Sequence, residues 1–293
     1  MLQIPETPPA SCSFVSQRLR MHYVDWGNHD APLLILVHGG QDHARNWDWL
    51  AGELRRDWHV VAPDLRGHGE SEWSPDGDYG HAAYVYDLAQ LIRVCGDERP
   101  VSIVGHSLGG VISCRFAGAF PERVRRLVSI EGISMMPWVD AGDEVPPLAQ
   151  RLRGWVEDRQ DFAAREPRRF DTFAQTCERM KANNAALSDE QAHHLALYGT
   201  RRNEDGTFSW RFDDYTRKAT MIDITRAEER GLYGEITCPV LLLQGGASWF
   251  NDPREDGREG FFREVRTVSF EGAGHWIHHD RPEAVLAELQ DFL

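Results

Sequence analysis

A chain of 293 residues, 41% of them hydrophobic and 27% charged, can bury one large core and has the composition of a globular protein. Its formal net charge of −14 argues against partners with anionic surfaces, both nucleic acids and membranes. There is no apolar run near the roughly 20 residues that span a bilayer and no signal-peptide pattern, and the five cysteines are widely spaced, so we expect a cytoplasmic protein with reduced thiols.

The amino-terminal half alternates short apolar runs with helical segments. Leu33–Val37 is a continuous apolar run, which is typical of a strand buried on both faces of a parallel sheet. This alternation predicts an α/β fold with a doubly wound, mostly parallel sheet, in which ligands bind beyond the carboxyl ends of the strands. The expected strands are two within 14–26, then Leu33–Val37, 59–62, 101–104 and Val124–Ile130, with helices over 44–55, 84–94 and the segment after residue 107.

The alternation stops between residues 134 and 230, where the sequence has helical spacing and no convincing strand. We expect an inserted helical cap there, with helices within 147–157, 167–183 and 188–198. Ser188 and Gln191 have the spacing of a capping box. The sheet is expected to resume at 239–243 and to end with Val265–Phe270, followed by a closing helix over 282–293. Residues 1–133 and 231–293 would then form the core, and 134–230 the cap.

A serine motif lies between an expected strand and a helix rich in small residues. Gly105-His106-Ser107-Leu108-Gly109 matches the pattern G-x-S-x-G in the strand–turn–helix context that gives the motif its meaning. Such a turn holds the serine in a strained backbone conformation and exposes its hydroxyl at the end of the sheet. Ser107 is therefore the expected nucleophile.

A serine hydroxyl is a weak nucleophile until a neighbouring base accepts its proton. Of the 13 histidines, His275 follows the last expected strand and is preceded by Gly-Ala-Gly, so we expect it to be that base. His278 and His279 are expected just before the final helix, on its solvent side, and His193 and His194 on a face of a cap helix.

Taken together, these segments resemble the α/β-hydrolase fold superfamily. The resemblance rests on His38-Gly39-Gly40, on DLRGHGES at 64–71, on GHSLGG at 105–110 and on GAGHW at 272–276. It implies an oxyanion hole formed by the backbone amides of Gly40 and Leu108. It also implies a mostly structural role for the segment 64–71.

The acid departs from the family pattern. The resemblance implies an Asp three residues after the glycine that ends the penultimate strand, but the third residue after Gly245 is Ser248. Glu131 ends the strand after the nucleophile helix, the position from which haloalkane-dehalogenase-like members supply their acid. Asp252 in the loop after Ser248 is the open alternative. We favour Glu131 because a strand end holds it rigidly.

The expected activity is hydrolysis of a small, partly hydrophobic carboxylic ester through an acyl-enzyme intermediate. Met135, Trp138, Trp249 and Trp276 are candidates for the substrate pocket. A carbon–carbon hydrolase of ring-cleavage diketones, or a lactone, amide or thioester hydrolase, stays open, as does a non-catalytic ligand-binding protein. A serine at the nucleophile position argues against haloalkane dehalogenases and epoxide hydrolases. We expect a small-molecule substrate as partner, no cofactor and no metal, and no oligomeric state is indicated.

Overall fold

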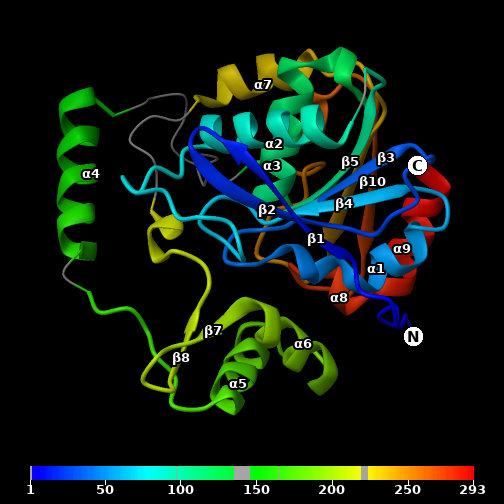
Figure 1. The fold of residues 1–293 in the computed structure, drawn as a ribbon. Helices are drawn as coiled ribbons and strands as arrows, with labels where there is room; N and C mark the ends of the chain where they lie inside the picture. The colour runs from blue at the N-terminus through cyan, green and yellow to red at the C-terminus, as the bar shows by residue number, and fades with distance from the viewer. Residues whose placement is uncertain (1, 97, 135–145, 164, 219–223) are drawn as a thin grey trace.

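The computed structural model describes residues 2–96, 98–134, 146–163, 165–218 and 224–293. Its centre is an eight-stranded sheet (Figure 1), which confirms the predicted doubly wound fold. The first two strands pair antiparallel, β2 pairs antiparallel with β4, and every other pairing in the sheet is parallel. In spatial order the strands are β1 (Ala10–Ser16), β2 (Leu19–Asp25), β4 (His59–Pro63), β3 (Leu33–Val37), β5 (Val101–His106), β6 (Val124–Ile130), β9 (Val240–Gly245) and β10 (Val265–Phe270).

Helices cover both faces of the sheet, which is why its inner strands carry buried apolar residues on both faces. In β3, Ile35 and Val37 belong to the hydrophobic cluster on one face, whereas Leu34 and Leu36 belong to the cluster on the other. The first cluster packs against α2 (His81–Cys95), α3 (Leu108–Ala119) and α7 (Arg226–Gly234). The second packs against the 3₁₀ helix η1 (Ala44–Trp47), α1 (Asp48–Leu54), α8 (Ile277–Asp280) and α9 (Pro282–Phe292).

The insertion between β6 and β9 contains helices, as predicted, and also a short hairpin. Its described elements are α4 (Leu148–Ala163), α5 (Phe173–Asn183), α6 (Asp189–Gly199), β7 (Thr200–Arg202), β8 (Phe208–Trp210), the 3₁₀ helix η3 (Asp214–Arg217) and α7. The prediction of no strand was wrong for β7 and β8, because two three-residue strands are too short to show an alternating pattern. The expected boundary at residue 230 falls inside α7.

The α5–α6 part of the insertion makes polar contacts with the core, whereas α7 packs into the first hydrophobic cluster. The His43 Nε2 atom lies 3.0 Å from the carbonyl of Leu195 in α6, and Asn184 donates to Asp280 at 3.1 Å. Ser188 and Gln191 form the predicted capping box at the start of α6. In the part of the chain that the structure describes, no helix has the length and apolar character to cross a membrane.

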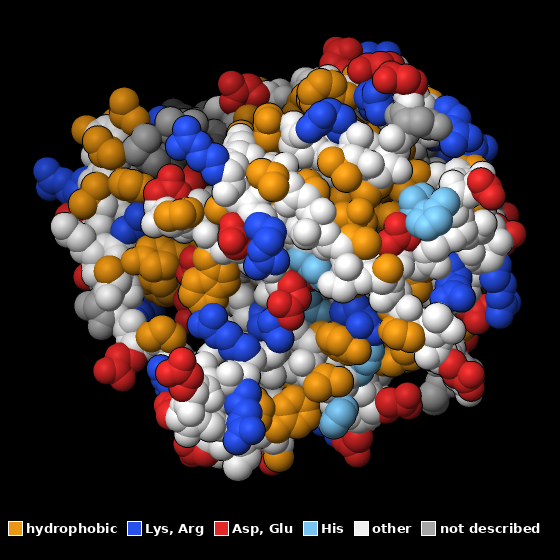
Figure 2. Space-filling view, viewed as in Figure 1, with side chains coloured by type: hydrophobic (Ala, Val, Ile, Leu, Met, Phe, Trp, Pro, Cys, Tyr) orange, Lys and Arg blue, Asp and Glu red, His pale blue; other side chains and the backbone are white. Residues whose placement is uncertain are grey.

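On the surface, charges of both signs are mixed. Figure 2 shows basic and acidic side chains interspersed on one face, with hydrophobic groups exposed on the side where α4 lies. Leu148, Leu152 and Val156 of α4 are among the exposed large hydrophobic residues. Two further 3₁₀ helices, η2 (Pro121–Arg123) and η4 (Arg258–Phe261), lie in connections on the core.

Candidate active site

Ser107 occupies a sharp turn between β5 and α3. Its backbone has φ 51° and ψ −119°, a conformation that residues other than glycine rarely adopt, and its amide donates to the Ile130 carbonyl at 2.8 Å. The turn is possible because glycines surround it. A Cβ on Gly109 would clash with the Val37 and His38 carbonyls, and one on Gly105 would clash with backbone at Gly109. The strained turn expected from the sequence is therefore present.

Glu131 stands at the end of β6, the strand beside β5. Its backbone φ is 53°, and its amide donates to the Leu243 carbonyl at 3.0 Å. One carboxylate oxygen, Oε1, accepts the Gly245 amide at 2.6 Å, and the other, Oε2, accepts the hydroxyl of Ser248. Ser248, which stands where the resemblance implies an Asp, thus serves as a hydrogen-bond donor to the carboxylate at the end of a neighbouring strand.

His275 lies in the loop that follows β10 and meets this carboxylate. Its Nδ1 atom is 3.2 Å from Glu131 Oε2, and its backbone carbonyl is 3.0 Å from the Nε2 atom of His106, the residue before Ser107. Aromatic rings surround the imidazole: Trp249 at 4.3 Å between centroids and Phe250 at 5.2 Å. The structure therefore brings the candidate base and the favoured acid together next to the serine turn.

Asp252, the alternative acid, is engaged elsewhere. Arg254 donates from Nε to Asp252 Oδ1 at 2.9 Å, and the hydroxyl of Ser269 lies 3.4 Å from Oδ2. The hydrogen bond with Arg254 holds the pKa of Asp252 below its usual value. Among the described residues, the hydrogen bonds of Asp252 do not include one to His275.

Burial moves the pKa values of His275 and Glu131 in opposite directions. Desolvation lowers the pKa of His275 to about 4, so the ring is neutral at neutral pH. Desolvation also raises the pKa of Glu131 to about 7, although the Ser248 hydroxyl and the Gly245 amide oppose this by stabilising the carboxylate. A neutral imidazole whose Nδ1–H faces a carboxylate leaves its Nε2 lone pair free to accept a proton.

The loop that carries Gly40 lies against the turn that carries Ser107 and Leu108. A Cβ on Gly39 would come 3.1 Å from Ser107 Cβ, and one on Gly40 would come 3.9 Å from a methyl carbon of Leu108. The glycines at 39 and 40 therefore let this loop approach the serine turn closely. The amides of Gly40 and Leu108 come from the two chain segments that meet there.

Two buried histidines hold this loop in place. His38 Nδ1 lies 2.6 Å from the Gly39 carbonyl, and His38 Nε2 accepts the Leu65 amide at 2.9 Å. His68 Nε2 accepts the Gln41 amide at 3.0 Å. Burial lowers the pKa of His38 to about 3 and that of His68 to about 4, so both rings stay neutral and can accept these amides. Their positioning role was not apparent from the sequence.

Asp64 joins the end of the loop after β3 to the segment 64–71. Its carboxylate accepts the Ala44 amide at 2.6 Å and the Glu70 amide at 2.9 Å, and lies 2.7 Å from His22 Nδ1. The contacts with His22 lower the pKa of Asp64 to about 2 although burial raises it. The structural role expected for residues 64–71 agrees with these contacts.

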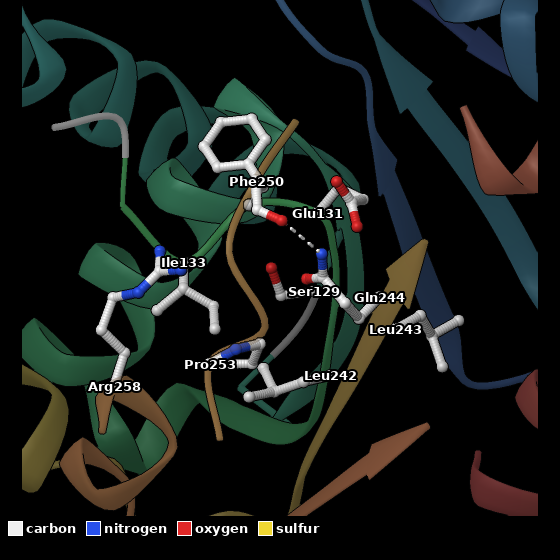
Figure 3. A pocket seen from close by; sticks show the side chains of 10 residues that line it. Ser129, Glu131, Ile133, Leu242, Leu243, Gln244, Phe250, Pro253 and Arg258 are labelled. Carbon is white, nitrogen blue, oxygen red and sulfur yellow. Dashed lines mark hydrogen bonds between the residues drawn. The ribbon is translucent and has the colours of Figure 1, made fainter. Parts of the chain in front are cut away.

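The predicted pocket residues have different outcomes. Met135 and Trp138 lie outside the described residues. Trp249 is 65% exposed, and its ring centroid is 5.6 Å from that of Trp276 beside His275. Figure 3 shows a small pocket that borders Glu131, where the Gln244 side chain donates to the Phe250 carbonyl at 3.0 Å.

The predicted solvent positions of His278 and His279 were wrong, because both side chains are buried. The sequence pattern places the start of the last helix at residue 282, but the preceding residues form α8, which packs on the sheet. The His278 ring stacks on Trp47 at 4.9 Å, and His279 lies 5.7 Å from Trp49. His193 and His194 both lie on α6, a helix of the insertion, as expected. His193 is exposed, whereas His194 is buried with Nε2 3.1 Å from Asp48 Oδ2.

Comparisons with known proteins identify the family. The family model of the alpha/beta hydrolase fold matches residues 32–282. A serine hydrolase-like protein of Danio rerio is 30% identical over 280 residues, which cover 92% of this chain and 83% of the relative. Esterase Rv0045c of Mycobacterium tuberculosis is 27% identical over 277 residues, 92% of this chain and 84% of the esterase.

The fold also resembles solved structures. A thioesterase domain from the curacin biosynthetic pathway superposes with a TM-score of 0.82 at 22% identity, over 97% of this chain and all of that domain (100%). This likeness concerns the fold. From the family match and the relatives together, the chain belongs to the alpha/beta hydrolase fold family and is a hydrolase.

Proposed function

We propose that this hydrolase cleaves a small, partly hydrophobic carboxylic ester through an acyl-enzyme intermediate, with Ser107, His275 and Glu131 as its catalytic triad. One observation carries the proposal: the Nδ1 atom of a buried, neutral His275 lies 3.2 Å from the carboxylate of Glu131, beside the strained turn at Ser107. The similarity to a mycobacterial esterase supports an ester as the substrate class.

In the first half of the reaction, Ser107 Oγ attacks the ester carbonyl while Nε2 of His275 accepts the hydroxyl proton. Glu131 stabilises the imidazolium through its contact with Nδ1. The tetrahedral intermediate then collapses, the bond between the carbonyl carbon and the alcohol oxygen breaks, and His275 gives its proton to the leaving alkoxide. The products of this half are an alcohol and the acylated Ser107.

In the second half, His275 accepts a proton from water as the water oxygen attacks the acyl carbonyl. The bond to Ser107 Oγ breaks, the serine recovers its proton from His275, and the carboxylic acid leaves. In both halves the negative charge on the carbonyl oxygen would be stabilised by the amides of Gly40 and Leu108. The amino-terminal end of α3 adds the positive end of its dipole there.

The substrate class follows from the side chains around the base. The rings of Trp249, Phe250 and Trp276 all lie within 5.2 Å of the His275 ring, centroid to centroid. Aromatic faces favour apolar groups over anionic ones, so an aliphatic or aromatic acyl or alcohol group fits beside this base. An anionic group at this position would lose hydration without gaining a partner.

A fluorophosphonate probe tests the nucleophile, and a series of p-nitrophenyl esters of graded acyl length tests the substrate, with a ring-cleavage diketone assayed in parallel. We expect labelling and ester turnover in the wild type, and loss of both in Ser107→Ala by about 1,000-fold or more. Ser13→Ala, which changes an exposed serine on β1, is the matched control and should leave both unchanged. Turnover of the diketone without turnover of any ester would contradict an ester substrate.

A further inference from the structure

Three potential metal ligands converge at the end of the sheet opposite Ser107. They are Asp25 at the end of β2, His29 in the following loop and His59 at the start of β4, and their ligand atoms all lie within 4.8 Å of one another. The candidate catalytic residues follow the carboxyl ends of β5, β6 and β10, whereas His59 begins a strand parallel to its neighbour β3. The two clusters are therefore separated by the length of the sheet.

The distances in this cluster are those of ligands around one ion. His59 Nε2 lies 3.1 Å from Asp25 Oδ2 and 3.2 Å from His29 Nδ1, and His29 Nδ1 lies 3.9 Å from Asp25 Oδ2. Two ligands about 2.1 Å from a tetrahedral Zn²⁺ lie about 3.4 Å apart. We propose that Asp25, His29 and His59 bind a divalent transition-metal ion, with Zn²⁺ as the best match to two imidazole nitrogens and one carboxylate oxygen.

Hydrogen bonding alone satisfies this arrangement poorly. His59 Nε2 carries at most one hydrogen when the ring is neutral, yet it faces both oxygens of Asp25 and the Nδ1 atom of His29 within 3.2 Å. If this hydrogen points at one of these three atoms, its hydrogen bonds to the other two are poorly aligned and weak. A cation between them would satisfy the carboxylate and both nitrogens together.

The backbone around the cluster is already held in place. The Gly27 amide donates to Asp25 Oδ1 at 2.8 Å, which orients the carboxylate and leaves Oδ2 toward the two imidazoles. The Asn28 side chain donates to the Arg55 carbonyl at 3.0 Å, and the His59 amide donates to the Pro32 carbonyl at 3.0 Å. Metal binding therefore needs little ordering of the chain.

Exposure of the cluster gives the ion a route to the site. The side chain of His29 is 71% exposed, whereas those of Asp25 and His59 are only 11% and 9% exposed. Three protein ligands leave the fourth position open to water at the surface. Such an ion would link the 26–32 loop to the start of β4 and stabilise the folded state by mass action. Sequence spacing did not reveal this site, since its ligands come from two separate segments.

Zn²⁺ titration of the metal-stripped protein, in competition with a chromophoric chelator, tests the proposal. We expect the wild type to bind Zn²⁺, His29→Gln to bind it at least about tenfold more weakly, and Asp25→Asn to be weakened similarly. His193→Gln removes an exposed histidine from α6 and should retain the wild-type affinity. Zn²⁺ should also raise the Tm of the wild type and of His193→Gln, and should raise that of His29→Gln less.

Because His29 is exposed, its substitution leaves the core intact, and the Tm of the metal-free variant checks this directly. The proposal is overturned if the wild type binds no Zn²⁺ by about 1 mM, or if His29→Gln retains the wild-type affinity. Binding that is lost in His275→Ala and kept in His29→Gln would instead place the ion at the active site.

Discussion

The sheet and the insertion between β6 and β9 are stabilised in different ways. Every residue of β4 and β5 is buried, and both strands pair with β3, which lies between them. In α4, by contrast, no described residue is buried. This helix is held by a hydrogen bond from Arg159 to the Gly77 carbonyl at 3.1 Å, by an ion pair of Lys218 with Asp158 at 2.6 Å, and by the contact of the Phe162 ring with Tyr215.

Because of this difference, the ends of the strands hold their side chains more rigidly than the insertion does. Ser107, Glu131 and the glycine loop at 39–40 all lie at ends of buried strands, where the backbone cannot shift without breaking the sheet. The insertion has fewer buried contacts, so its local unfolding costs less free energy. We therefore expect substitutions at the strand ends to affect turnover strongly, and substitutions in α4 to affect it weakly.

The largest contrast is expected between two carboxylates. Glu131→Gln keeps the shape of the side chain but removes the charge that stabilises the His275 imidazolium, so kcat should fall by about 10,000-fold. Asp252→Asn, the matched control in the neighbouring loop, should retain kcat within about twofold because Asp252 pairs with Arg254. Steady-state kinetics on a p-nitrophenyl ester measure both. The reverse order of effects would assign the acid to Asp252.

Two glycine-to-alanine substitutions, one at the strand ends and one in α4, test the same contrast through protein stability. A Cβ on Gly132 would clash with the Ser107 carbonyl and come 2.9 Å from the Ser107 amide, so Gly132→Ala should cost about 3 kcal/mol and disturb the serine turn. Gly154 in α4 has nothing within 4 Å of such a Cβ, so Gly154→Ala should stabilise that helix by about 1 kcal/mol. Urea unfolding and hydrogen exchange of the α4 amides measure the two effects. Equal effects at both positions would contradict the contrast.

The sequence predicted the sheet well because buried parallel strands leave a strong pattern. Continuous apolar runs such as Leu33–Val37 need helices on both faces, and the serine turn needs its glycines, so both features could be recognised locally. The contact between His275 and Glu131 was also expected, since both residues follow strands whose carboxyl ends meet at one edge.

What the sequence could not show depends on contacts between distant segments. Ser248 was recognised as a missing acid but not as a donor to Glu131, because that bond joins residues 117 positions apart. The loop contacts of His38 and His68 depend in the same way on where the chain folds back. His278 was misplaced because a four-residue helix has too few positions to show which face is buried.

The buried histidines of the core predict loss of stability in acid. Burial lowers the pKa values of His38 and His279 to about 3 and that of His68 to about 4, against 6.5 in the unfolded chain. Between about pH 6.5 and 4 the unfolded state therefore binds protons that the folded state does not. Each of these rings lowers the free energy of unfolding by up to about 1.4 kcal/mol for every pH unit of acidification. Glu131, whose pKa is raised to about 7, acts in the opposite direction between about pH 4.5 and 7.

The buried histidines together outweigh this one carboxyl, so the free energy of unfolding should fall as the pH is lowered from 6.5 towards 4. Urea unfolding at a series of pH values measures the slope. His279→Phe keeps a ring against Trp49 and should reduce the slope by about one proton. A slope that His279→Phe leaves unchanged would mean that His279 is not neutral in the folded state.

The smallest effect is expected from substitution of Ser248, which donates a hydrogen bond to Glu131. Its hydroxyl lowers the pKa of Glu131 by stabilising the carboxylate, so Ser248→Ala should raise that pKa and move the acidic limb of the kcat/KM profile up by about one pH unit. Ser248→Thr keeps a hydroxyl and should restore the wild-type limb. Ser248 Oγ also accepts the Phe250 amide at 3.2 Å, so the substitution could act through the loop instead. An equal loss of kcat/KM at every pH, with no shift of the limb, would identify that second route, because moving the loop lowers activity without changing which protonation state of Glu131 is active.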